Sequence, residues 1–135
     1  MHLTDYLEGQ LINHIFRTGS FTKPTTLAVA LFTAAPSDAG GGTEVTGGSY
    51  ARVAVAPGDA NWSAPSAGNG TTDNVGTVTF PQATADWGLA THWGVFDATS
   101  AGNLLVWAPL TASRNITTGA TPSFGAGALT VQMDN

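Results

Sequence analysis

The sequence predicts a mainly β fold: an antiparallel β-sandwich or jelly-roll-like domain of seven or eight strands, with one amphipathic α-helix at the N-terminus. Three observations support this prediction. Apolar residues follow a helical spacing only near the start of the chain, and after residue 26 their period changes to two. Short apolar segments then recur about every 8–15 residues, separated by Gly, Asn, Asp and Ser. The length of 135 residues suits a single domain, 1–135.

Residues 3–17 are predicted to form the helix, because their apolar residues recur three or four positions apart. One apolar stripe contains Leu3, Leu7, Leu11 and Ile15, which recur at every fourth position, and an adjoining apolar stripe contains Ile12 and Phe16. Thr4 or Asp5 is expected to cap the start of this helix, and Gly19 stands where a helix end is expected. His14 lies on or beside the apolar face, where we expect a packed, hydrogen-bonded histidine rather than a metal ligand.

The remaining residues, 26–133, are predicted to form the β-sandwich. The predicted strands are 26–32, 50–56, 75–80, 91–98, 104–110 and 114–118, a weak segment near Phe124, and 128–133. These segments are short, carry β-branched or aromatic residues, and are bounded by turn-forming residues, which is typical of strands in an all-β domain.

Two polar segments, 36–49 and 57–74, are predicted to be long, flexible loops. Loops of this length are usually functional or are ordered by a partner. Trp62 lies in the second loop, and we expect so large an aromatic side chain to be buried somewhere. Two interpretations remain open: Trp62 folds back on its own domain, or it contacts a neighbouring subunit or a ligand, because tryptophan is enriched at interface hot spots.

The composition argues against several classes of function. Only 10% of the residues are charged, and the formal net charge is −5. The positive residues are Arg17, Lys23, Arg52 and Arg114. So few cations cannot neutralise a run of phosphates, and we expect no nucleic-acid partner. The apolar runs are far shorter than the roughly 18 residues that span a membrane, the start has no signal-peptide pattern, and there is no cysteine for disulfides or thiol chemistry.

No common catalytic motif is present in the sequence. Asp86 and His92 are conceivable as an acid–base pair, with Asp97 as a further carboxylate, but aspartates at strand ends are ordinary turn residues. The loop acids Asp38, Glu44, Asp59 and Asp73 lack the spacing of a calcium-binding loop. We therefore expect a protein that is not an enzyme, with no catalytic, cofactor-binding or metal-ligating residues and no cofactor.

Several motifs together resemble a family of small tailed-bacteriophage proteins usually labelled tail fibre proteins. They are YLE…NH.F at 6–16, LFTAAPSDAG at 31–40, GGSYAR at 47–52, FPQATADWG at 80–88, and HWGVFDA with GNLL at 92–105. The resemblance covers nearly the whole chain except about 57–74. It implies a structural protein on the virion surface, assembled in the host cytoplasm, as a tail-fibre component or as a capsid decoration (cement) protein.

A virion protein of this kind is expected to bind copies of itself, as a trimer that fits both capsid and fibre symmetry, and to bind other virion proteins. The sequence has no heptad or repeat from which a fibre shaft is built, which favours a globular tip, base or capsid clamp. The candidate interface residues are Leu3, Leu7, Leu11, Ile12, Phe16 and Trp62.

The alternative function is a glycan-binding receptor-recognition module of the tail, whose partner is a host surface glycan. This alternative predicts a groove lined by exposed Trp62, Trp87 or Trp107, on which sugar rings stack.

Overall fold

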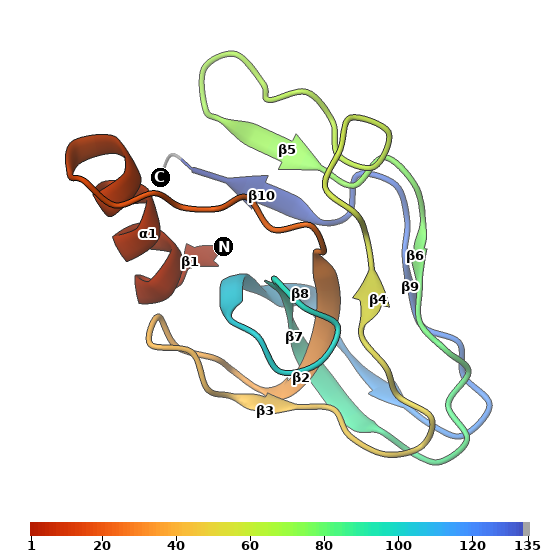
Figure 1. Ribbon diagram of the computed structural model, residues 1–135. Coiled ribbons are helices and arrows are strands. Elements are labelled where there is room, and N and C mark those ends of the chain that lie inside the picture. The colour runs from red at the N-terminus through yellow and green to blue at the C-terminus, as the bar shows by residue number, and fades with distance from the viewer. Residues whose placement is uncertain (134–135) are drawn as a thin grey trace.

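The computed structural model of the chain describes residues 1–133 and contains one helix beside a set of antiparallel strands (Figure 1). The elements are β1 (His2–Leu3), α1 (Asp5–Phe16), β2 (Ala28–Ala34), β3 (Thr43–Glu44), β4 (Val53–Ala54), β5 (Thr71–Asp73), β6 (Val78–Thr79), β7 (Gly88–Phe96), β8 (Leu104–Ile116), β9 (Ser123–Phe124) and β10 (Thr130–Gln132). The mainly β class with one N-terminal helix is therefore confirmed.

Six strands form the main sheet, in the order β1-β8-β7-β2-β3, with β4 also paired to β2. Every pairing is antiparallel. One edge of β2 pairs with β7, and the other edge is shared by β4 near Ala28 and by β3 near Phe32. The long strands β7 and β8 are the centre of the molecule, and register shifts at two points bend their ladder.

Two short ribbons, β5 with β10 and β6 with β9, form a second layer over one face of this sheet (Figure 1). The main core lies between the layers, where Val29 and Trp93 of the sheet belong to one cluster with Phe80 and Leu129 of the second layer. A smaller cluster, which contains Phe32, lies on the opposite face of the sheet. Successive residues of a strand point to opposite faces, so β2 is buried on both sides.

The structure corrects the predicted strand boundaries in two ways. The predicted segments 104–110 and 114–118 are one strand, β8, because β7 pairs with residues on both sides of the interval between them. The short strands β1, β3 and β5 lie in segments that were predicted to be helix or loop. Each is a strand because of its partner, which is β8, β2 or β10, and two or three residues are too few for a local pattern.

The helix begins where the sequence predicts, with Thr4 as its N-cap. The Thr4 Oγ1 accepts a hydrogen bond from the Leu7 N–H at 3.4 Å and donates one to the Leu104 carbonyl at 2.6 Å. This one hydroxyl therefore caps α1 and fastens it to β8. The helix ends at Phe16, one residue before the predicted end, and the backbone of Arg17 is extended.

His14 differs from the prediction in its burial. Its Nδ1 accepts a hydrogen bond from the Phe21 N–H at 3.2 Å, as expected of a hydrogen-bonded histidine. The side chain is nevertheless exposed and not packed in a core. The reason is that the sheet does not cover this end of α1, where every residue from Ile12 to Phe16 is exposed.

Within residues 1–133, no helix is long and apolar enough to cross a membrane, since α1 has only 12 residues. In the same part of the chain, no three His, Cys, Asp or Glu side chains are grouped so as to hold a metal ion.

Candidate functional site

The second half of α1 carries three apolar side chains that lie in solvent. Ile12, Ile15 and Phe16 are 54%, 64% and 79% exposed, and we call this set the exposed helix face. An exposed cluster of large apolar residues on a surface helix is typical of an interaction site. In Figure 1, α1 lies at one side of the molecule, beside the short strand β1.

The predicted interface residues divide into two groups. Leu3 and Leu7 are partly buried and pack against the main core, so they fasten the N-terminus to its own domain. Leu11 is half-buried, and Ile12 and Phe16 are exposed. The domain therefore covers the side of the helix that carries Leu7, whereas the adjoining apolar stripe with Ile12 and Phe16 is uncovered.

Trp62 also packs against the main core of its own domain and is half-buried. A β-bridge to Asn74 fixes its backbone, and within residues 1–133 its indole Nε1 is buried with no hydrogen-bond partner. Trp62 and Leu7 line the same mostly apolar pocket of about 530 Å³. The other apolar side chains of this pocket include Leu27, Val95, Leu105, Val106 and Val131. The structure thus brings together two of the six predicted interface residues.

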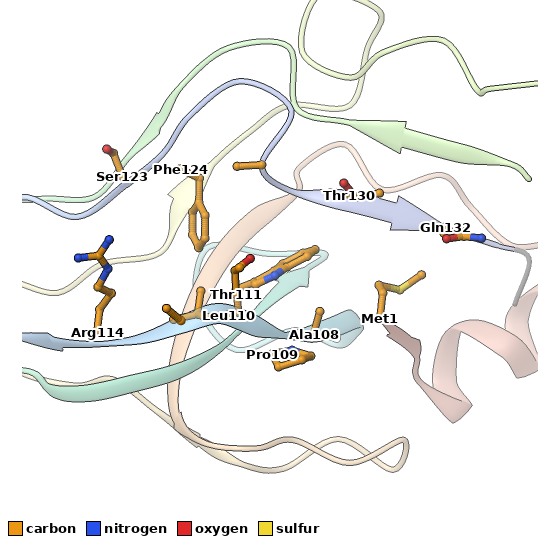
Figure 2. A pocket seen from close by; sticks show the side chains of 13 residues that line it. Met1, Ala108, Pro109, Leu110, Thr111, Arg114, Ser123, Phe124, Thr130 and Gln132 are labelled. Atoms are coloured by element: carbon orange, nitrogen blue, oxygen red, sulfur yellow. The ribbon is translucent and has the colours of Figure 1, made fainter.

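A second hollow runs along β8, and Figure 2 shows its walls. We call it the β8 groove; its volume is about 650 Å³. One wall is β8, which contributes Ala108, Leu110 and Arg114 from both sides of the point where its pairing with β7 changes register. The opposite wall comes from β9 and β10, with Phe124 pointing toward β8 in the close-up view.

The polar groups of the β8 groove are not used by the fold. Arg114 is exposed and, among the described residues, makes no ion pair and no side-chain hydrogen bond. The hydroxyls of Thr111, Ser123 and Thr130 make no hydrogen bond within that part of the chain either. None of the Asp and Glu residues between 1 and 133 lines the groove. The groove therefore has one cation without a counterion of its own.

Arg52, in contrast, is fully engaged inside the fold. Its guanidinium makes two hydrogen bonds of 2.8 Å to the Glu44 carboxylate, donates to the carbonyls of Ala98 and Ala101, and lies 3.4 Å from the centre of the Phe96 ring. These contacts hold the predicted loop 36–49 against the sheet.

Tyr50 extends this cluster into the core. Its hydroxyl donates to Glu44 at 2.9 Å and accepts from the Leu31 N–H at 3.0 Å. Burial raises the pKa of Tyr50 well above its usual range, and the charge of Glu44 acts in the same direction. The phenol therefore stays neutral and serves as a structural hydrogen-bonding group.

The candidate acid–base residues each have a local structural role. Asp86 accepts hydrogen bonds from the backbone N–H and the hydroxyl of Thr118, at 2.7 and 3.0 Å. These bonds lower the pKa of Asp86. Asp97 binds Asn103 at the other end of β7, and His92 lies between them, 5.7 Å from the Trp107 ring. The structure shows no ion pair between His92 and either carboxylate within the described residues.

The tryptophans proposed for sugar stacking do not form a common platform. Trp87 is 5% exposed and donates its indole N–H to the Gly48 carbonyl at 2.9 Å. Trp107 is half-buried, and the His2 imidazole stacks on it with ring centres 4.4 Å apart. Trp62 lies in a separate, apolar pocket. The β8 groove combines the aromatic ring of Phe124 with hydroxyl, amide and guanidinium groups, which are the kinds of group that bind sugars.

Comparison with protein families places the chain in the class of bacteriophage fibre proteins, because one family model matches residues 2–132. That model is described as podophage GP4 fiber I protein gp80, and the chain belongs to this family. The resemblance that the sequence motifs predicted is thereby confirmed. A search of curated proteins finds no match. Family membership makes the chain a phage structural protein and a component of the virion.

Sequence reasoning did not identify the β8 groove. Arg114 was noted only as one of four cations, and Phe124 only as a weak strand. No local pattern indicates the groove, because its lining comes from β8, β9 and β10 and because β8 changes register between Pro109 and Arg114.

Proposed function

We propose that this chain is a non-enzymatic structural component displayed on the surface of a tailed-phage particle, where it binds copies of itself through the exposed helix face. The observation that carries the proposal is the exposure of Ile12, Ile15 and Phe16 on a domain that already has a well-buried core. Association removes these side chains from water, and each large apolar side chain contributes about 1.5–3 kcal/mol when fully buried.

A trimer is the proposed oligomer, since three-fold symmetry fits both fibres and capsids. Three copies of the exposed helix face can meet at one axis, and closed rotational symmetry leaves no copy with an unsatisfied apolar face. The small, mostly uncharged side chains of the surface favour such contacts, because they lose little conformational entropy on burial.

The tail is the proposed location, because the family that matches the chain is a fibre family. Capsid decoration is the alternative. The test is the copy number of this polypeptide in separated head and tail fractions of the purified particle, measured by quantitative mass spectrometry. A small number of copies confined to tails is the expected result. A number comparable with the major shell protein, confined to heads, would identify a decoration protein, and absence from both fractions would contradict a structural role.

A second candidate function is glycan recognition. The β8 groove favours it, since Phe124 supplies an aromatic ring and Thr111, Ser123 and Thr130 supply hydroxyl groups. Arg114 makes no ion pair among the described residues. The two functions are compatible, because the residues of this groove and those of the exposed helix face are different.

A further inference from the structure

The volume of the β8 groove and the aromatic ring of Phe124 in its wall suit a short saccharide. The volume of about 650 Å³ lies within the roughly 300–1,000 Å³ that is typical of small-ligand sites. Phe124 is half-buried in the groove, and its ring meets Trp93 edge to face with centres 6.4 Å apart. Trp93 is only 5% exposed, so it holds the Phe124 ring in place. A fixed ring of this kind offers an apolar surface to the C–H face of a sugar.

The rim of the groove supplies hydrogen-bonding groups with fixed positions. Ser123, Thr130 and Gln132 come from β9 and β10, whose backbones pair with β6 and β5, and Thr111 comes from β8 at its register shift. Hydroxyl and amide groups both donate and accept, as the hydroxyls of a sugar do. Because strands hold these side chains, little ordering remains to be done when a ligand binds.

Arg114 determines the chemical class of the ligand. Its guanidinium is at one end of the groove in Figure 2, near Ser123, and no described carboxylate lines the hollow. A guanidinium forms two parallel hydrogen bonds with a carboxylate, a geometry that a neutral hydroxyl does not match. The formal net charge of −5 opposes the approach of dense polyanions, so one carboxylate for each bound segment is the fitting charge.

We propose that the β8 groove binds a carboxylated saccharide of the uronic or sialic acid type, with its carboxylate on Arg114 and one sugar face against Phe124. This inference rests on the second proposed function, glycan recognition, and names the chemical class of the glycan. It does not depend on assembly through the exposed helix face, whose residues do not line the groove.

The test uses the full chain and three probes that each carry one carboxylate: methyl galacturonoside, a disaccharide with a single glucuronic acid, and 3′-sialyllactose. Amide NMR spectra are recorded during titration, with the methyl ester of each probe as a neutral counterpart. We expect at least one acid to shift resonances of β8, β9 and β10, and its ester to bind about tenfold more weakly or worse. If none of the acids shifts these resonances, or if acid and ester bind equally, the proposal is wrong.

Two variants locate the carboxylate. Arg114→Gln is expected to weaken binding of the acid about tenfold and to leave the ester unaffected. Arg17→Gln removes the same charge from an exposed position outside the groove and is expected to bind like the parent protein. Equal losses in both variants would overturn the assignment to Arg114. Assembly is measured separately by light scattering, so a failure of saccharide binding is distinguishable from a failure of the proposed oligomer.

Discussion

The strand β2 and the helix α1 are both rich in apolar residues, yet the fold uses them in opposite ways. In β2, five consecutive residues from Ala28 to Phe32 are buried, because the strand has a core cluster on each face. In α1, no residue is buried, and Phe16 at its end is 79% exposed. The apolar side chains of β2 hold the domain together, whereas those at the end of α1 are available to a partner.

This difference separates the residues that stabilise the domain from those proposed for assembly. The core does not need the second half of α1, since its buried members lie in the sheet, the ribbons and their connections. The helix is attached at its first half by the Thr4 cap and by the packing of Leu3 and Leu7. Changes in the two regions should therefore affect different measurements.

The largest expected effect is at Phe32, which is 1% exposed and stacks with Phe96 at 6.1 Å between ring centres. Phe32→Ala should lower the free energy of unfolding by about 3–5 kcal/mol, because it leaves a cavity. The same substitution in the helix, Phe16→Ala, should change it by less than about 0.5 kcal/mol. Urea denaturation of the two variants measures both values, and similar losses would contradict the contrast between β2 and α1.

A smaller loss of stability is expected when the contacts between Arg52 and Glu44 are removed. Arg52→Ala breaks the two hydrogen bonds to Glu44 and leaves that carboxylate, whose side chain is 23% exposed, without its counterion. Partial solvation of Glu44 moderates the cost, so we expect about 1–3 kcal/mol of lost stability. Arg17→Ala, at an exposed site, is the matched control and should lose almost nothing in the same denaturation experiment.

A still smaller effect is expected at Asp86, and only in acid. The hydrogen bonds from Thr118 lower the pKa of Asp86 below its ordinary value of 3.8, so the charged form is favoured in the folded state. This contribution is present above pH 3.8 and is lost as the pH falls through the lowered value. Thermal unfolding of Asp86→Asn should therefore show a shallower decrease in Tm below pH 4 than the parent. Identical acid profiles would show that these bonds do not stabilise the fold.

The smallest effect on stability, and the largest on assembly, is expected for the exposed helix face. The double variant Ile12→Ser with Phe16→Ser should leave the free energy of unfolding within about 0.5 kcal/mol of the parent. It should nevertheless be monomeric in light scattering under conditions in which the parent is an oligomer. A control with Val75→Ser and Leu89→Ser, which changes two apolar residues that are 48% and 51% exposed elsewhere, should keep the parent's oligomeric state. If both double variants have the same oligomeric state, the exposed helix face is not the contact between copies.

The elements that the sequence predicted well are those with a local pattern. The helix was expected at 3–17 and is found at Asp5–Phe16, since its spacing and its Thr4 cap lie within one segment. The strand expected at 26–32 is found at Ala28–Ala34, because an unbroken apolar run is typical of a strand buried on both faces. The virion class followed from motifs distributed along the chain and is confirmed by the family that matches residues 2–132.

The elements that the sequence did not predict depend on pairing partners that lie far away along the chain. The strand β5 exists because Thr72 pairs with Val131, and β8 is continuous because β7 supports it on both sides of its middle. The candidate site shows the same dependence: Leu7 and Trp62 meet in one pocket although 55 positions separate them in the sequence. Local periodicity carries no information about such pairs.

Composition and periodicity were enough to establish a β-rich domain with an amphipathic helix, few charges and no thiol chemistry. Tertiary structure decided which apolar residues are covered. Leu7 and Phe16 are both apolar residues of α1, but their spacing of nine positions places them on opposite sides of the helix, and only Leu7 packs against the core. It also decided that Arg114 lies in a groove opposite Phe124, whereas Arg52 is neutralised by Glu44. The physical reason is that burial and charge pairing depend on the three-dimensional neighbours of a side chain, which packing brings together from separate segments.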